Sequence, residues 1–116
     1  MSKFFDVRPT SADPLEHITT AISNIRKIVI GHTRESFAND LIVRLAVERL
    51  LELISEASRH ISAEAKAQEP SIHWRRLADL GNRLRHAYHE TDAGLLWDMI
   101  ENDLEPLDKF LKRIAN

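Results

Sequence analysis

Apolar residues along most of the chain recur every three or four positions, the spacing that places them on one face of an α-helix. The first stripe follows Asp13 and Pro14, a pair that suits a helix start because aspartate caps free amides and proline fits the first turn. Gly31 closes this helix, as a C-terminal glycine does. The apolar members of the stripe are Leu15, Ile18, Ile22, Ile25 and Val29.

The second stripe begins between Thr33 and Ser36 and predicts one long helix, because neither glycine nor proline interrupts the chain as far as Glu69. A helix of roughly thirty residues would span about 45 Å and would form the spine of the fold. Its stripe consists of Phe37, Leu41, Leu45, Leu50, Ile54, Ala57 and Ile61.

Two further stripes complete the pattern. One runs from Trp74 to Tyr88, and the other begins at Thr91 or Asp92 and contains Pro106, which predicts a break between Asn102 and Glu105. No segment alternates as a strand does. We therefore predict an all-α protein, an antiparallel up-down bundle of four main helices. Residues 1–116 would form a single domain in which 1–12 is an N-terminal arm.

Composition narrows the class of protein. The chain has 116 residues, of which 43% are hydrophobic and 29% charged, and it has no cysteine, so disulfides and thiolate metal sites are excluded. No apolar run approaches the roughly twenty residues that span a bilayer, and we expect a cytoplasmic protein. The net charge is −2, so contact with nucleic acid has to be local. The local candidate is the stretch from Arg75 to Arg85, which holds four arginines.

The stretch from Gly81 to Tyr88 gathers most of the candidate chemistry. Within eight residues it carries an amide, two guanidiniums, an imidazole and a phenol. An imidazole titrates near neutral pH and transfers protons, while arginine stabilises charge on a phosphate. The three histidines nearby lack the spacing of a helical zinc pair, so we expect neither a metal site nor a cofactor. They are His73, His86 and His89.

The last third of the chain resembles the HepT-like branch of the HEPN ribonucleases, the toxin half of prokaryotic toxin–antitoxin pairs. The resemblance covers most of residues 14–111. The matching segments are Trp74-Arg75, Asn82 to Tyr88, Leu96-Trp97 and Asn102 to Leu104, together with Ala46 to Arg49 and Ile54 to Ala57.

The resemblance implies metal-independent RNA cleavage at a homodimer interface, with His86 transferring the proton and Asn82 orienting the ring or a phosphate. The family pattern also places an arginine directly before the amide residue, and here that position is Gly81. Arg85 or Arg83 would have to supply the missing charge. Arg85 lies one helical turn beyond Gly81, so its side chain can reach back toward that position.

A second implication concerns regulation of the toxin. In the family that the chain resembles, the partner is an MNT-type nucleotidyltransferase antitoxin of a type VII-like pair. The antitoxin transfers AMP from ATP to a motif tyrosine, which is Tyr88 here.

Other interpretations remain open on the sequence alone. Gly81 at the arginine position favours a non-catalytic HEPN interaction module that dimerises and binds the nucleotidyltransferase, and an unrelated helical scaffold is a third possibility. The carboxylates of Glu48 and Glu56 could form an acid–base pair, although we favour a salt bridge from Glu56 to an arginine near the motif. Trp74 and Trp97 are expected to anchor the core or a dimer interface.

Overall fold

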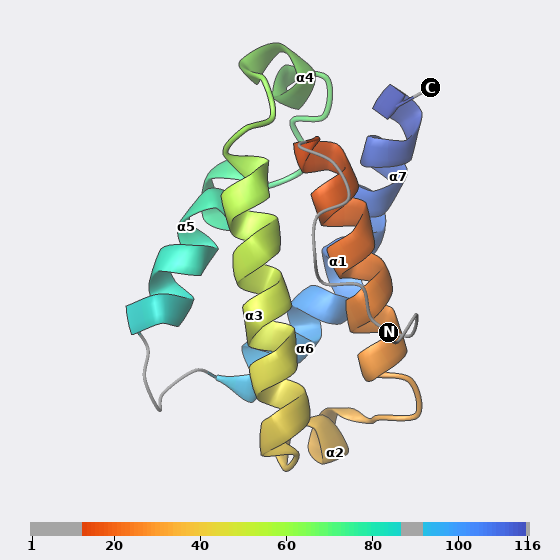
Figure 1. Cartoon of the computed structure of the whole chain (residues 1–116), viewed down its shortest axis with the longest axis vertical. Coiled ribbons are helices and arrows are strands. Elements are labelled where there is room, and N and C mark those ends of the chain that lie inside the picture. Colours follow the sequence, from red (N-terminus) through yellow and green to blue (C-terminus); the bar gives the residue numbers. More distant parts are fainter. Residues whose placement is uncertain (1–12, 87–91, 116) are drawn as a thin grey trace.

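The computed structural model describes residues 13–86 and 92–115, apart from the side chain of His86, and every regular element within them is helical (Figure 1). The predicted all-α class is confirmed, but the division into four main helices is not. The described residues form seven helices: α1 (Pro14–Ile28), α2 (Arg34–Ala38), α3 (Leu41–Ser58), α4 (Ala63–Ala67), α5 (Trp74–His86), α6 (Ala93–Asn102) and α7 (Leu104–Ala115).

Three sequence predictions fall wholly or partly outside the described residues. These predictions concern the N-terminal arm (residues 1–12), Tyr88 and His89, all of which lie outside the described residues. None of the described helices is long and apolar enough to cross a lipid bilayer.

The start of α1 confirms the capping prediction. The Asp13 carboxylate accepts a hydrogen bond from the amide of Leu15 at 2.9 Å, and Pro14 occupies the first turn. The helix ends at Ile28, slightly before Gly31, which turns the chain with a φ of 78°. Glycine adopts this left-handed conformation without steric cost, so it suits the short link to α2.

The predicted long second helix was wrong, because short polar side chains break it into α2, α3 and α4. The Asp40 carboxylate accepts a hydrogen bond from the amide of Val43 at 3.1 Å and begins α3. The Ser62 hydroxyl does the same for the amide of Ala65 at 3.0 Å and begins α4. Such side chains replace helical hydrogen bonds and allow a turn without glycine or proline. The remaining spine, α3, has 18 residues and a length of about 27 Å.

The break before α3 also changes which residues are buried. Leu41 and Leu45, predicted to belong to the buried stripe, are 59% and 53% exposed. They lie on a different face of α3 from Val47 and Leu51, which are fully buried. Phe37 stays in the core because α2 is a separate helix with its own orientation.

The core lies where α3 packs between α1 and α5, with α6 and α7 completing it (Figure 1). Two aromatic pairs close its sides. Phe37 packs against Trp97 with ring centroids 5.4 Å apart, and Trp74 meets Phe110 edge to face at 5.3 Å. Both tryptophans therefore anchor the core, which was one of the two roles predicted for them.

The predicted break near Pro106 is confirmed between α6 and α7. The former ends at Asn102 and the latter begins at Leu104, which places Pro106 in the first turn of α7. Proline is tolerated there because amides in the first turn have no helical acceptor.

One buried carboxylate ties α7 to α1. Asp108 is 6% exposed, and its carboxylate lies 3.0 Å from both the Arg26 guanidinium and the Lys112 ammonium. Burial alone would raise the pKa of Asp108, but hydrogen bonds and charge from these two cations outweigh it and hold the pKa below its ordinary value. The carboxylate thus remains charged inside the fold, where it holds the two helices together.

Candidate active site on α5

The part of the predicted motif that the structure describes lies on the C-terminal half of α5. Leu80 and Leu84 face the core from this half, and Asn82 and Arg83 are exposed. Residues three and four apart share a helix face, and α5 remains helical through position 86. Asn82 and Arg83 therefore stand one turn before position 86. The His86 side chain itself lies outside the described part of the chain.

A single hydroxyl group holds α5 against α3. Ser55 on α3 is 1% exposed, and its hydroxyl donates to the carbonyl oxygen of Ala78 at 3.0 Å. The Ser55 hydroxyl oxygen also accepts a hydrogen bond from the amide of Gly81 at 2.9 Å. Arg59, one turn along α3, donates a second bond to the Ala78 carbonyl at 2.8 Å. These contacts fix the backbone of α5 directly before the motif.

The close contact leaves little space for a side chain at position 81. A Cβ atom on Gly81 would lie 3.0 Å from the Ser55 hydroxyl oxygen and 3.2 Å from the Ser55 Cβ. Ser55 cannot easily withdraw, because it is buried and holds two hydrogen bonds. The packing of α5 on α3 therefore disfavours a side chain at position 81, which gives the departure from the family pattern a structural basis.

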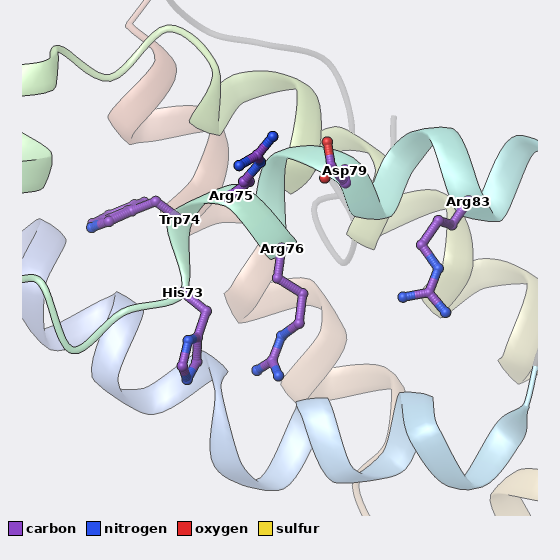
Figure 2. A pocket seen from close by; sticks show the side chains of 6 residues that line it. All are labelled: His73, Trp74, Arg75, Arg76, Asp79 and Arg83. Atoms are coloured by element: carbon purple, nitrogen blue, oxygen red, sulfur yellow. The ribbon is translucent and has the colours of Figure 1, made fainter.

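Arg85 reaches back to Gly81, as the one-turn spacing allows. Its Nη1 atom lies 3.5 Å from the position that a Gly81 Cβ would occupy. Arg83, two residues earlier, leaves α5 on a different side and lines a groove with Arg76 and His73 (Figure 2). The two arginines are therefore not equivalent, because only Arg85 places a guanidinium beside the position where the family pattern has one.

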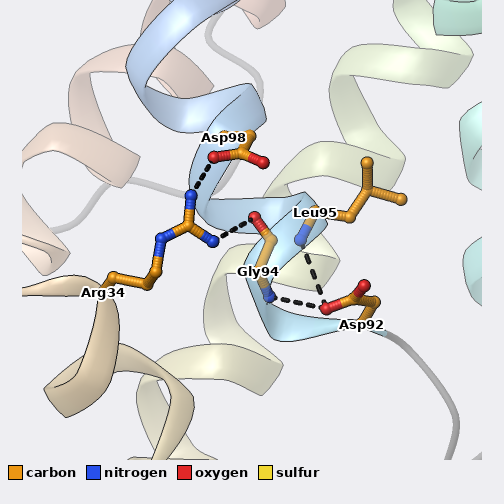
Figure 3. Close-up of polar contacts among 5 residues, drawn as sticks. All are labelled: Arg34, Asp92, Gly94, Leu95 and Asp98. Carbon is orange, nitrogen blue, oxygen red and sulfur yellow. Dashed lines mark hydrogen bonds and ion pairs between the residues drawn. The ribbon is translucent and has the colours of Figure 1, made fainter.

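The chain is held again where α6 begins. Asp92 accepts hydrogen bonds from the amides of Gly94 at 2.8 Å and Leu95 at 3.4 Å, which confirms one of the two predicted caps (Figure 3). Arg34 on α2 donates to the Gly94 carbonyl at 3.3 Å and pairs with Asp98. The start of α6, which follows residues 87–91, is thus fixed by side-chain contacts.

The carboxylates on α3 take no part in this arrangement. Glu56 is exposed and lies 3.8 Å from the imidazole of His60, so the predicted salt bridge to an arginine near the motif was wrong. Its neighbour Ser55 faces α5, and residues one apart do not share a face. Burial raises the pKa of Glu48. Within the described residues, no three side chains of the kinds that bind metals lie together.

Comparison with known proteins identifies the family. Residues 18–114 match the family model described as Ribonuclease HepT-like. The chain is 37% identical over 95 residues to "Probable ribonuclease HepT" of Thermococcus cleftensis, covering 82% of this chain and 86% of that protein. It is 33% identical over 104 residues to a "Putative RNase" of Methanocaldococcus jannaschii, covering 90% and 92%. No solved structure matches the chain.

The chain therefore belongs to the HepT-like ribonuclease family. The resemblance read from the motif residues is confirmed, and the interpretation as an unrelated helical scaffold was wrong.

Two residues that fix the site were not singled out from the sequence. Ser55 and Arg59 position α5, although neither belongs to the motif. Ser55 carries a detectable signal, because it is a small hydroxyl residue one turn after Leu51 and next to Ile54, inside an otherwise apolar stripe. Nothing in the sequence indicates that its partner is Gly81, which lies 26 residues away.

The packing at Gly81 predicts the effect of a single methyl group. Gly81→Ala should lower the free energy of unfolding by about 1–2 kcal/mol, because overpacking outweighs the helix-propensity gain of up to about 1 kcal/mol. Urea denaturation followed by circular dichroism measures this change. Gly94→Ala is the matched control, since its Cβ would meet mainly the flexible end of Arg34, and it should cost less. A stabilised Gly81→Ala variant would contradict the close contact.

Proposed function

We propose that this chain is an endoribonuclease of the toxin type, acting without a metal ion, and that residues 1–116 form one domain. Family membership supports the activity. The observation that carries the proposal is the Arg85 guanidinium beside Gly81, because it supplies positive charge where the family arginine is missing. RNA is the proposed substrate, and we place the action of the protein in the cytoplasm.

The reaction we propose uses the nucleophile that RNA carries itself. His86 accepts the proton of a 2′-hydroxyl, and the freed oxygen attacks the adjacent phosphorus. The bond from phosphorus to the 5′-oxygen breaks as the new bond forms, which leaves a 2′,3′-cyclic phosphate. The departing 5′-oxygen takes a proton from a protonated imidazole. Each proton transfer suits a group that titrates near pH 6.5.

The neighbouring side chains on α5 have distinct proposed roles. Arg85 stabilises the negative charge that builds on the phosphoryl oxygens, the largest single contribution in many such reactions. Asn82, one turn before position 86, orients the imidazole or the phosphate. Arg83 binds the substrate on the side of the groove rather than at the scissile phosphate.

A homodimer would bring two such motifs into one cleft and supply the second imidazole. An exposed apolar surface on α3 supports self-association. Leu41, Ile42 and Leu45 are 59%, 80% and 53% exposed, and Leu45 lies four positions after Leu41 and three after Ile42. In Figure 1, the N-terminal end of α3 lies toward the same end of the molecule as the C-terminal end of α5. Contiguous exposed apolar residues of this kind mark contact surfaces.

Regulation by a partner completes the proposal. An MNT-type nucleotidyltransferase antitoxin would transfer AMP from ATP to the Tyr88 phenol and release pyrophosphate. The added phosphate would bring negative charge next to the motif, where it would repel the RNA backbone. Tyr88 lies two residues after His86 in the sequence, which supports this role.

The catalytic proposal predicts a ranking of variants. His86→Ala should reduce RNA cleavage by roughly 10²- to 10⁴-fold. Arg85→Ala should cost roughly 10- to 10³-fold, mainly in kcat, whereas Arg83→Ala should raise KM more than it lowers kcat. Steady-state cleavage of a labelled single-stranded RNA over a range of substrate concentrations measures both constants. Arg49→Ala, which removes an exposed guanidinium on α3, is the matched control and should leave the rate unchanged.

Full cleavage by His86→Ala would overturn the mechanism. Wild-type protein that leaves RNA intact, yet self-associates and binds a nucleotidyltransferase, would identify the chain as a non-catalytic HEPN module. Gly81 is the observation that favours this second candidate function.

Modification of Tyr88 is testable by mass spectrometry. Incubation with a genetically adjacent nucleotidyltransferase and ATP should add one AMP to a peptide containing Tyr88 and abolish RNA cleavage. Tyr88→Phe should remain unmodified while still cleaving RNA, since only the hydroxyl group is lost. An AMP adduct on Tyr88→Phe would place the acceptor elsewhere.

Self-association depends on the exposed leucine and isoleucine side chains of α3 in this proposal. Ile42→Asp should convert a dimer into a monomer in light scattering after size-exclusion chromatography, because it places a charge in an apolar contact. The circular dichroism spectrum should not change, since Ile42 is 80% exposed in the folded chain. Glu56→Gln, on the same helix, should remain dimeric. A dimeric Ile42→Asp protein would exclude this surface as the interface.

A further inference from the structure

A basic groove runs along the N-terminal part of α5 and does not include Gly81. It encloses about 510 Å³ and is lined by His73, Trp74, Arg75, Arg76, Asp79 and Arg83. In Figure 2, the side chains of His73, Arg76 and Arg83 point to the same side of α5, toward the ribbons of α6 and α7. This spacing follows from the sequence, because these residues lie three and seven positions apart.

The positive charge in the groove is largely unpaired. Among the described residues, Arg75 and Arg83 form no ion pair or side-chain hydrogen bond. Arg76 lies 3.4 Å from the carboxylate of Asp103, an exposed contact that contributes little to stability. Arg75 and Asp79 both line the groove, and in Figure 2 both point to the side of α5 opposite to Arg76 and Arg83. The groove also lies near the N-terminal end of the helix, where the helix dipole is positive.

This concentration contrasts with the rest of the chain. The whole protein has 16 lysines and arginines against 18 aspartates and glutamates, whereas residues 75–85 contain four arginines and one aspartate. Such local charge attracts an anion even when the protein carries a net negative charge.

We propose that this groove binds the phosphate backbone of the RNA strand away from the scissile bond, an inference that rests on the proposed function. A strand bound here would pass Arg83 and continue along α5 toward position 86, about 15 Å from Arg76. An acidic segment of a protein partner would fit the charge, but it would not require the groove to continue into the motif.

The groove reads no bases in this proposal. Its aromatic residue, Trp74, packs on Phe110, and its indole N–H donates to the carbonyl oxygens of Lys66 and Glu69, both at 3.1 Å. Trp74 is therefore committed to the core and is not a stacking platform. Guanidiniums that contact phosphates position a strand without selecting its sequence. Uridine- and adenine-rich strands should consequently bind with similar affinity.

The test measures RNA binding separately from cleavage. In a His86→Ala background, fluorescence anisotropy with a labelled single-stranded RNA of about twelve nucleotides gives the affinity over a range of KCl concentrations. Adding Arg75→Ala and Arg76→Ala should weaken binding about tenfold or more. The slope of log K against log[salt] should become shallower by about 0.7 for each lost phosphate contact. Arg49→Ala with Lys109→Ala removes the same charge from exposed sites and should leave the slope unchanged.

Cleavage assays on the same substitutions in the wild-type background complete the test. With the long RNA, KM should rise about tenfold while kcat stays constant, and cleavage of a dinucleotide too short to reach the groove should not change. Unaltered RNA affinity and salt slope in the Arg75→Ala and Arg76→Ala protein would overturn the inference. It would also be overturned if these substitutions weakened binding to a protein partner and left RNA binding intact. Absence of RNA binding by the His86→Ala parent would also overturn it, whereas absence of cleavage by wild-type protein would overturn only the proposed catalytic function.

Discussion

The arrangement of the motif depends on the Ser55 hydroxyl, which lies between α3 and α5. It satisfies a backbone donor and a backbone acceptor of α5 at once, through Gly81 and Ala78. A buried hydroxyl with both functions used is strongly held, because breaking either bond would leave a polar group unsatisfied. The position and rotation of α5 follow from this contact, and they decide which of its side chains face solvent.

The contact between Ser55 and Gly81 also bears on why the family arginine is absent from position 81. A helix held this closely leaves little space for a side chain at position 81, so in the proposed mechanism the charge comes from elsewhere. Arg85, one turn later, places its guanidinium beside the empty position. Arg83 is nearer to the amide residue in sequence, but it serves the groove on another side of the helix. Loss of a motif residue is thus compatible with retention of the charge that it supplies.

The distribution of charge along α5 links the two proposed sites. The arginines of the groove are left mostly unpaired, whereas Arg26, Lys112 and Arg113 elsewhere form ion pairs with carboxylates. Paired cations stabilise the fold but offer little attraction to an anionic ligand. Unpaired cations spaced along one helix offer several separate contacts, which suits an extended polyanion better than a small ligand.

Local chemistry explains why the sequence determined the helical class, the Asp13 cap, a cap at Thr91 or Asp92, the break near Pro106 and the motif. Each depends on residues within a few positions, as does the one-turn reach of Arg85. The division of the long second helix was missed because Asp40 and Ser62 act as caps only when their side chains turn to the backbone. Exposure of Leu41 and Leu45 and the Ser55–Gly81 contact were decided by tertiary structure. They depend on how separate helices are rotated against one another, and that rotation is set by packing between residues far apart in the chain.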